Sequence, residues 1–246
     1  MISIIICSID PDRFRAVSEM YGRVFAGESF EIVAIHDAQG LAEGYNRAVT
    51  AAKGDLVIFS HDDVEVLNAD FKHRLIDHMA HADLVGVAGA TRVIGGAWAS
   101  NAPPYVFGQI AHQREKGFEV ILWGVPKRRI DGIKVMDGVF LCARRPVVEK
   151  VKFDETTFAG FHLYDVDFTF RAFLAGFRLA VGCDLRLLHF SSGRWDRSWR
   201  HDENVFRAKF HGRLETLDCN SHRIAGVDVE TREELLEVMS PHWWDR

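Results

Sequence analysis

Three acidic residues and a histidine follow an apolar segment of the sequence, and their types suit a metal ion. The segment LVIFS, residues 56–60, is followed directly by His61, Asp62 and Asp63, with Glu65 two residues further on. Carboxylates just past a buried strand repel each other and lose hydration, so a cation between them stabilises the cluster. Hard oxygen ligands with one imidazole suit Mg²⁺ or Mn²⁺ better than a structural zinc ion. The alternative is a solvated turn whose acids cap the helix that follows.

A second pair of acids, Asp165 and Asp167, lies near the start of an apolar helical pattern in HLYDVDFTFRA. Positions two apart on an α-helix lie about 200° apart around its axis, so the two side chains cannot point the same way. One of them is therefore expected to face a cleft and act as a general base, while the other caps the helix or pairs with Arg171. The alternative is that both are ordinary first-turn acids, which the helix dipole favours.

Several histidines are weaker candidates. His189 ends another apolar segment, LRLLHF, where a metal ligand could lie. A lone histidine is more often a partly buried residue with an ordinary hydrogen-bond partner. His73, His78 and His81 lie on an amphipathic helical pattern without two shared i,i+4 spacings, and we expect them at the surface.

The elements that must position these residues alternate between strands and helices over the first third of the chain. Apolar segments predict strands at 2–9, 30–35, 56–60 and 84–89, and helical spacing predicts helices over 11–26, 41–53 and 69–80. Near-continuous apolar strands in this order indicate a parallel sheet covered by helices on both faces. Ligands of such sheets bind beyond the carboxyl ends of the strands, which is where His61, Asp62 and Asp63 fall.

Beyond residue 90 the pattern weakens and then returns. Residues 91–135 form a long excursion with one expected strand, EVILWG, and such excursions are often functional. Further strands are expected at GVFLCARR, FRLAV and LRLLHF, with helices starting near Pro146 and around Asp165. A last helix is expected to open at Thr231, since Glu234 three residues later completes a capping-box pattern. We expect one domain over residues 1–213, with a helical C-terminal extension, residues 214–246, packed on it.

Composition and charge describe an ordinary globular protein. The 246 residues are 48% hydrophobic, enough for a sizeable core, and the net charge of −5 favours no nucleic-acid partner. The four cysteines have no paired spacing and are expected to be reduced thiols: Cys7, Cys142, Cys183 and Cys219. The apolar N-terminus is short and lacks a basic leader, so we expect a first strand and not a signal peptide. Because no apolar run approaches the roughly 20 residues of a membrane span, we predict a cytoplasmic protein, with peripheral contact at the inner face of a membrane left open.

Three segments in this order resemble the nucleotide-sugar-dependent glycosyltransferases of the GT-A fold, closest to glycosyltransferase family 2. They are GLAEGYNRAVTAAKGDLVIFSHDDVEV, DGVFLCARR and FHLYDVDFTFRAFLAGFRLAVGCDLRLLHFSSG, and the likeness covers about residues 1–210. The resemblance implies an α/β, Rossmann-like, mostly parallel sheet flanked by helices. The chain departs from the family pattern at two positions: the family's usual first metal-binding Asp falls on His61, and Tyr164 replaces a Glu.

The acids after LVIFS would then be this chain's DxD motif, which holds a divalent cation, Mn²⁺ or Mg²⁺, against the diphosphate of a nucleotide sugar. The metal ligands implied are Asp63, His189 and Glu65, with Asp62 as an alternative to Glu65 within the motif. Asp165 matches the base that takes a proton from the acceptor hydroxyl, which implies a single displacement with inversion. Contacts to the nucleotide or donor sugar are implied for Ser8, Asp10, His36, Asp37, Asn46, Asp62, Asp137 and Gly138.

The leading hypothesis is a metal-dependent inverting glycosyltransferase, with a UDP-sugar as the favoured donor and a glycan or lipid-linked acceptor. A sugar-phosphate nucleotidyltransferase would want a Gly-rich phosphate loop after the first strand, and CSIDPDRF has no Gly. A non-catalytic nucleotide-sugar-binding or interaction module of the same fold is another alternative, and a glycosidase a distant one. The Trp- and Arg-rich segment 191–213 could close over the diphosphate, meet a phosphate-bearing lipid or an anionic membrane, or form a packed helix with a basic face.

Overall fold

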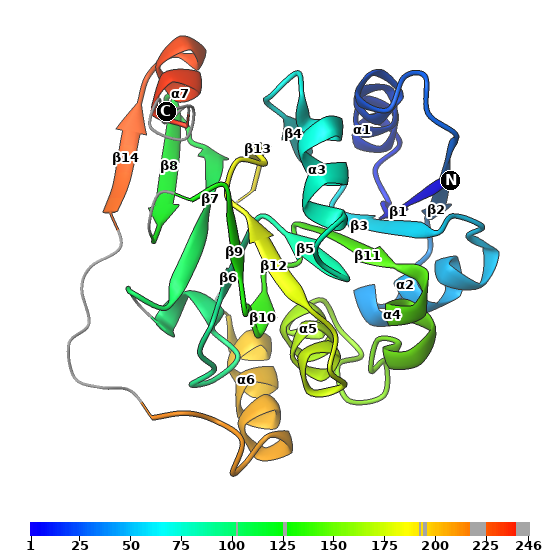
Figure 1. Cartoon of the computed structure of the whole chain (residues 1–246), viewed down its shortest axis with the longest axis vertical. Helices are drawn as coiled ribbons and strands as arrows, with labels where there is room; N and C mark the ends of the chain where they lie inside the picture. Colours follow the sequence, from blue (N-terminus) through cyan, green and yellow to red (C-terminus); the bar gives the residue numbers. More distant parts are fainter. Residues whose placement is uncertain (102, 125–126, 192, 194–195, 217–224, 240–246) are drawn as a thin grey trace.

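In a computed structural model (Figure 1), the described residues are 1–101, 103–124, 127–191, 193, 196–216 and 225–239. Cys219, together with Arg194 and Trp195 of the Trp- and Arg-rich segment, lies outside the described residues. The other three cysteines are free thiols.

The main sheet has seven strands in the order β2-β1-β3-β11-β5-β12-β9. They are β2 (Phe30–Ile35), β1 (Ile2–Cys7), β3 (Leu56–Ser60), β11 (Phe140–Arg144), β5 (Leu84–Gly86), β12 (Leu179–Gly182) and β9 (Arg129–Asp131). β1, β2, β3, β5 and β12 run in one direction, while β11 and β9 run against their neighbours. The mostly parallel α/β sheet expected from the sequence is therefore confirmed.

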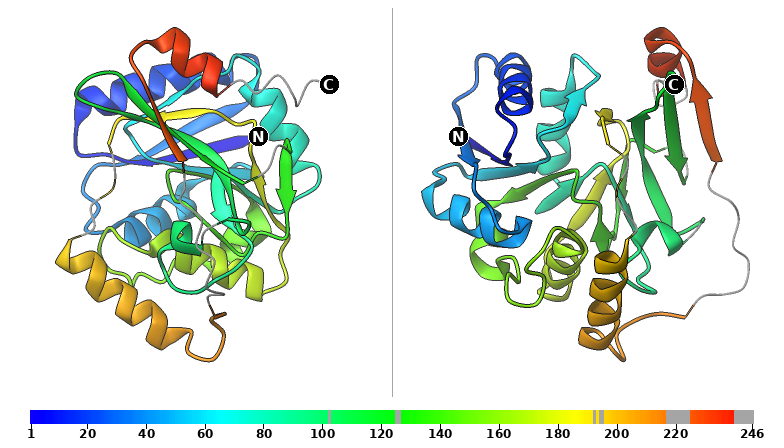
Figure 2. Two further views of the ribbon diagram at one scale, coloured as in Figure 1. Left: turned by 90° about the vertical axis from the view of Figure 1, so that its left-hand side faces the viewer. Right: turned by 180° about the vertical axis from the view of Figure 1, so that it is seen from behind.

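Helices cover both faces of this sheet (Figures 1 and 2). α1 (Pro11–Val24) and α3 (Phe71–Met79) lie on one face, and α2 (Leu41–Ala51), α4 (Arg145–Val151) and α5 (Tyr164–Leu174) lie on the other. Adjacent strand residues point to opposite faces, so Ile4 and Ile6 join the core under α1 while Ile5 joins the core under α2. This burial on both faces explains why the strands are apolar without alternation.

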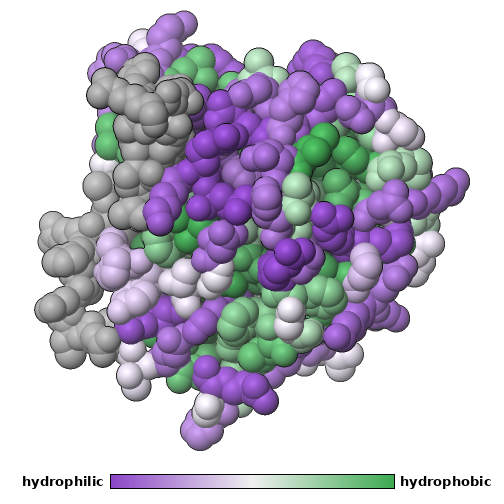
Figure 3. Space-filling view, viewed as in Figure 1, coloured by the Kyte–Doolittle hydropathy of each residue, from purple (hydrophilic) through white to green (hydrophobic). Residues whose placement is uncertain are grey.

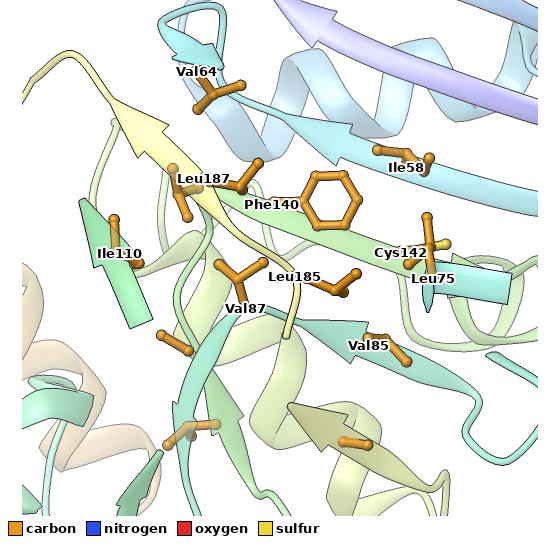
Figure 4. Close-up of a cluster of buried hydrophobic side chains, with 14 of the residues drawn as sticks. Ile58, Val64, Leu75, Val85, Val87, Ile110, Phe140, Cys142, Leu185 and Leu187 are labelled. Carbon is orange, nitrogen blue, oxygen red and sulfur yellow. The ribbon is translucent and has the colours of Figure 1, made fainter. Parts of the chain in front are cut away.

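A second sheet continues from the first because four strands bend from one sheet into the other. Its strands are β10 (Val135–Met136), β6 (Ala88–Ala90), β7 (Val106–Gln113), β13 (Leu187–His189), β4 (Val64–Val66), β8 (Phe118–Trp123) and β14 (Ala225–Val229). β3 leads into β4, β5 into β6, β10 into β11 and β12 into β13, each across one to four residues. Figure 4 shows buried side chains of these strands in one cluster, including Ile58, Val64, Val87, Phe140 and Leu187. The two sheets thus share a continuous core.

The excursion over residues 91–135 holds more regular structure than the single strand expected. It contains β7, β8, β9 and the short 3₁₀ helix η1 (Trp98–Asn101). β7 is hidden in the sequence because Gly108, at a φ of 116°, and Gln109 interrupt its apolar pattern. Gln109 is nonetheless buried, since its side chain donates to the carbonyl of Cys183 at 2.6 Å.

His78 lies inside the molecule and not at the surface, where the sequence pattern predicted it. Its Nε2 lies 2.5 Å from a carboxylate oxygen of Asp184, which is fully buried in the turn between β12 and β13. Arg74 of α3 and Arg128 also donate to Asp184, each at 2.9 Å. The surface prediction for His78 was wrong because Asp184, its partner in the interior, lies 106 residues away in the sequence.

The C-terminal part contains a strand as well as helices. α6 (Arg197–Lys209) lies within the predicted domain 1–213. In the predicted extension, β14 pairs with β8 before α7 (Arg232–Val238) begins at the predicted capping box of Thr231 and Glu234. Within the described ranges, no helix is both long and apolar enough to cross a membrane. On the face seen in Figure 3, hydrophobic residues form separate patches among hydrophilic ones.

Candidate functional site

Three strand ends at the junction of the two sheets bring candidate metal ligands together. His61 follows β3, Asp63 precedes β4, and His189 ends β13, which pairs with β4. The backbone N–H of Phe190 donates to the carbonyl of Asp63 at 2.9 Å and fixes their alignment. One donor atom from each of His61, Asp63 and His189 lies within 4.8 Å of the other two. We refer to these three residues as the His-Asp-His cluster.

The spacing of the donor atoms fits a single divalent ion. His189 Nε2 lies 3.2 Å from Asp63 Oδ1 and 3.3 Å from His61 Nδ1, and His61 Nδ1 lies 3.9 Å from Asp63 Oδ1. Ligand atoms held about 2.1 Å from one ion lie roughly 3 Å apart at right angles and about 3.4 Å apart at the tetrahedral angle. Two imidazoles and one carboxylate suit a first-row transition metal and leave further positions open for a substrate.

Burial and mutual contacts set the charges of this cluster. Burial lowers the pKa of His61, and the neighbouring His189 lowers it further, so the imidazole is neutral and can offer a lone pair. Burial acts in the opposite sense on Asp63, but the hydrogen bond and the electrostatic interaction with His189 hold the pKa of the carboxyl well below its usual range. The cluster therefore combines an ionised carboxylate with a neutral imidazole, as a metal site requires.

Residues expected to bind the nucleotide meet at the ends of β1, β2 and β3. Ser8 donates its hydroxyl to Asp62 at 2.6 Å, and its carbonyl lies 2.8 Å from Nδ1 of His36. The carboxylate of Asp10 accepts hydrogen bonds from the first backbone N–H groups of α1, so this residue serves as the N-cap of that helix. Ser8, Asp62 and His36 thus form a connected group beside the His-Asp-His cluster.

Two other residues predicted to bind the donor have protein partners. Asp37 forms an exposed ion pair with Arg47 at 2.7 Å. Asn46 pins the segment after α4, because its side-chain amide donates to the carbonyl of Phe153 and accepts from the backbone N–H of the same residue, both at 2.9 Å. The structure does not bring Asn46 into the group at the strand ends.

Glu65, predicted as a metal ligand, lies outside the His-Asp-His cluster. Its carboxylate forms an ion pair with Arg232 of α7. Glu65 lies in β4, which begins at Val64. Two residues of extended strand span about 6.6 Å, so Glu65 lies away from Asp63.

The candidate base, Asp165 of α5, lies against a second crossing between the sheets, the segment between β10 and β11. Asp165 accepts a hydrogen bond from the backbone N–H of Gly138 at 2.7 Å, and a Cβ on Gly138 would collide with Asp165 and Tyr164. Burial and the nearby charge of Asp137 raise the pKa of Asp165 to about 7. Asp137 itself accepts hydrogen bonds from Nε1 of Trp98 at 3.0 Å and from the backbone N–H of Val139 at 2.9 Å. Asp165 therefore has the proton affinity of a general base that works near neutral pH.

Asp167 points away from Asp165, as the helical spacing predicts. It is fully buried and pairs with Arg171 at 2.7 Å and with Lys209 of α6 at 2.5 Å. Its role is to hold α6 against α5.

A cavity of about 520 Å³ is lined by His61 and His189 of the His-Asp-His cluster and by Asp165. Aromatic side chains from four separate segments contribute to its wall: Trp98, Trp123, Phe161 and Trp199. Trp98 and Trp123 pack edge to face, with ring centroids 5.0 Å apart. Sequence reasoning did not single out Trp98, Trp123 or Phe161, for which the one available signal was the presence of tryptophans in the weakly patterned excursion. Trp199 belongs to the Trp- and Arg-rich segment, for which closure over the diphosphate was one of the alternatives.

A family model described as "Glycosyltransferase like family" matches residues 3–209. This chain belongs to that family. A search of curated proteins finds no match. The resemblance drawn from the sequence is therefore confirmed at the level of the family.

Solved structures share the fold of this glycosyltransferase-like chain at low sequence identity. The mannosyltransferase PcManGT from Pyrobaculum calidifontis, in complex with GDP-Man and Mn²⁺, has a TM-score of 0.53 and 13% identity over 88% of this chain and 65% of its own. TarS 1–349 from S. aureus, in complex with UDP-GlcNAc, has a TM-score of 0.51 and 12% identity over 87% of this chain and 68% of its own. GalNAc-T7 with UDP, GalNAc and Mn²⁺ has a TM-score of 0.50 and 9% identity, over 78% and 44%. The glycosyltransferase-like chain thus has the GT-A fold.

Proposed function

We propose that this protein transfers a sugar from a nucleoside-diphosphate sugar to an acceptor hydroxyl, with a divalent metal and with inversion at the anomeric carbon. The observation that carries this proposal is that the two histidines of the His-Asp-His cluster line the same cavity as Asp165. Metal-binding and proton-accepting groups are the two parts that such a transfer needs. The family to which the chain belongs supports the same reaction class.

In the proposed mechanism, His61, Asp63 and His189 would hold the ion at the end of the main sheet. A bound Mn²⁺ or Mg²⁺ would supply Lewis acidity that offsets the charge on the departing diphosphate. Asp165 accepts the proton of the acceptor hydroxyl as its oxygen bonds to the anomeric carbon and the bond to the diphosphate breaks. The hydrogen bond from Gly138 holds the carboxylate of Asp165 in place for this step.

Inversion follows from a single displacement by the acceptor. Retention by double displacement would need a second carboxylate free to attack the sugar. Asp137 is the nearest candidate, but Trp98 and the backbone of Val139 donate to its two oxygens. We therefore assign Asp137 to positioning the cavity wall and not to nucleophilic attack.

For the acceptor, we propose a saccharide. Sugar rings combine an apolar face with hydroxyl groups, and the cavity offers the matching pair of surfaces. Phe161 is 57% exposed, and Trp98 and Trp199 also line the wall, while Asp165 and His162 supply polar groups. Phe161→Ala should raise the KM for a saccharide acceptor and leave donor binding unchanged. An unchanged KM for the saccharide in Phe161→Ala would oppose this acceptor class, whereas a simple alcohol should be used equally by both proteins.

A UDP-sugar is our proposed donor, and a direct binding experiment tests it. Isothermal titration with UDP, GDP and dTDP, first with Mn²⁺ and then with EDTA, should show one nucleotide that binds only in the presence of the metal. An assay with the corresponding nucleotide sugar and an acceptor would then distinguish an enzyme, which releases the nucleotide and transfers the sugar, from a non-catalytic binding module. Absence of binding to every nucleotide would overturn the proposal.

We also propose that the protein works in the cytoplasm, with the inner face of a membrane as the alternative. Three free cysteine thiols support a reducing compartment. Fractionation of cells with and without a high-salt wash would distinguish the two locations.

A further inference from the structure

The two positions at which this chain departs from the family pattern are in direct contact. His61 and Tyr164 are 103 residues apart in the sequence, yet Nε2 of His61 lies 2.9 Å from Oη of Tyr164. The contact joins both departures in one side-chain hydrogen bond.

Tyr164 is rigidly held at this contact. Its side chain is only 3% exposed, and it begins α5 beside Asp165. Its ring packs against Tyr45 and Phe153, with centroid separations of 5.7 and 6.2 Å. Gly138 lies so close to the phenol oxygen of Tyr164 that a Cβ at position 138 would collide with it. The hydroxyl of Tyr164 is therefore a fixed point from which His61 can be oriented.

The direction of this hydrogen bond follows from what each nitrogen of His61 faces. Nδ1 faces Asp63 and His189, and binding a metal there requires a lone pair on that nitrogen. The ring proton must then lie on Nε2, from which it donates to the oxygen of Tyr164. A partner of this kind fixes both the tautomer and the orientation of a metal-ligating histidine.

We propose that Tyr164 is a positioning residue that holds His61 as a metal ligand, and that this pair makes the site prefer Mn²⁺ or another transition metal to Mg²⁺. The inference rests on the proposed function, because it concerns the metal of that reaction. An imidazole in place of a carboxylate removes an oxygen ligand and a negative charge. Mg²⁺ binds mainly through oxygen, whereas transition metals accept nitrogen readily.

The first test compares Tyr164→Phe with the wild-type protein by titration with Mn²⁺ and Mg²⁺ alone. We expect wild-type protein to bind Mn²⁺ at least tenfold more tightly than Mg²⁺. Loss of a hydrogen-bond partner behind a ligand typically weakens metal binding about 10–100-fold, so Tyr164→Phe should lose Mn²⁺ affinity in that range. Spin-echo spectroscopy of bound Mn²⁺ should show nitrogen couplings from two imidazoles in the wild type and a weakened second coupling in the variant.

Tyr21→Phe is the matched control. Tyr21 is also a fully buried tyrosine, and its hydroxyl donates to Ser60 at 2.7 Å. Ser60 donates in turn to the backbone carbonyl of His61, so these hydrogen bonds reach the backbone of His61 but not its ring. Tyr21→Phe should lower the melting temperature and leave Mn²⁺ affinity unchanged. Similar losses of metal affinity in both variants would show a general effect of removing a buried hydroxyl and would overturn the assignment to Tyr164.

A second background keeps the test decisive if Tyr164→Phe is unstable. In His61→Asp, Mg²⁺ affinity should approach Mn²⁺ affinity, and adding Tyr164→Phe should have no further effect on metal binding, because the oriented ring is gone. Additive losses would contradict the coupling. A wild-type protein that binds no divalent ion would remove the metal from the proposed function itself, whereas a wild type that binds Mn²⁺ and Mg²⁺ equally would overturn only the inference about His61 and Tyr164.

Discussion

At the scale of single residues, Asp165 has the least ordinary environment in the cavity. The same burial that raises its pKa to about 7 leaves it ionised only in neutral and alkaline solution. A raised pKa makes the carboxylate a stronger base at the moment when it must accept a proton.

This environment predicts the pH dependence of the reaction. The base is protonated and inactive below its pKa, so kcat/KM should rise with pH and level off above about 7. Asp165→Asn should bind the donor normally and lose about 10²–10⁴-fold in kcat, with no remaining rise near neutral pH. Donor titration and an initial-rate series from pH 5 to 9 measure both. Full activity in Asp165→Asn would move the base to another group, with Asp137 first.

The two acids of the motif that are two residues apart should behave differently. Asp63→Ala should abolish the Mn²⁺ dependence of nucleotide binding, because it removes the one carboxylate of the cluster. Glu65→Gln should leave Mn²⁺ affinity within about twofold, because its carboxylate is used by Arg232. Titration of the two variants side by side decides the matter, and a large loss in Glu65→Gln would return it to the metal site.

Residue types predict much of this site, and the remainder depends on contacts that the sequence does not display. Acids and histidines at strand ends and helix starts make Asp63, His189 and Asp165 candidates, and the family resemblance selects them from their neighbours. The family resemblance implies a binding role for Asn46, but its amide forms hydrogen bonds with Phe153 and Glu155. The partnership of His61 with Tyr164 could not be foreseen, because it depends on how α5 meets the end of β3.

At the scale of elements, the turn between β12 and β13 determines where His189 lies. Asp184 in this turn binds His78 and Arg74 of α3 together with Arg128. Burial alone would raise the pKa of Asp184, but these partners lower it to about 2. The turn is thus fixed by one carboxylate with three partners.

Removing that charge should destabilise the protein in a pH-dependent way. Asp184→Asn should cost about 3 kcal/mol at pH 7, as expected for a broken buried ion pair. The wild-type advantage should be complete above an unfolded pKa near 3.8 and disappear as the pH falls through about 2. Urea unfolding of both proteins at several pH values measures the difference. Asp77→Asn is the control, because Asp77 is an exposed partner of Arg128 at 3.9 Å and should change stability by less than about 0.5 kcal/mol. A pH-independent difference would contradict this account of Asp184.

Elements of the main sheet could be predicted, whereas most of the second sheet could not. Strands buried on both faces, such as β1 and β3, are largely apolar segments, and this pattern predicts them from the sequence. β7 and β14 contain glycines and polar residues whose places are decided by neighbouring strands. Pairing across distant segments, and not local preference, forms these elements.

At the scale of the whole molecule, the shared core of the two sheets predicts cooperative behaviour. Calorimetry should show one unfolding transition. Nucleotide and Mn²⁺ at about 100 times their dissociation constant should stabilise the fold by about 2.7 kcal/mol and raise the single Tm by about 5–10 °C. Two transitions, of which only one moves with ligand, would show that the sheets unfold separately.

The strand crossings have a further consequence for engineering. Exchanging the second sheet for that of a relative would require cuts wherever the chain passes between the sheets, including the four direct crossings. Two of these crossings contain His61 and Asp137, so chimeras joined there would be damaged at the site that they were meant to redirect. New acceptor preferences are better sought by substitutions at the aromatic wall than by exchange of modules.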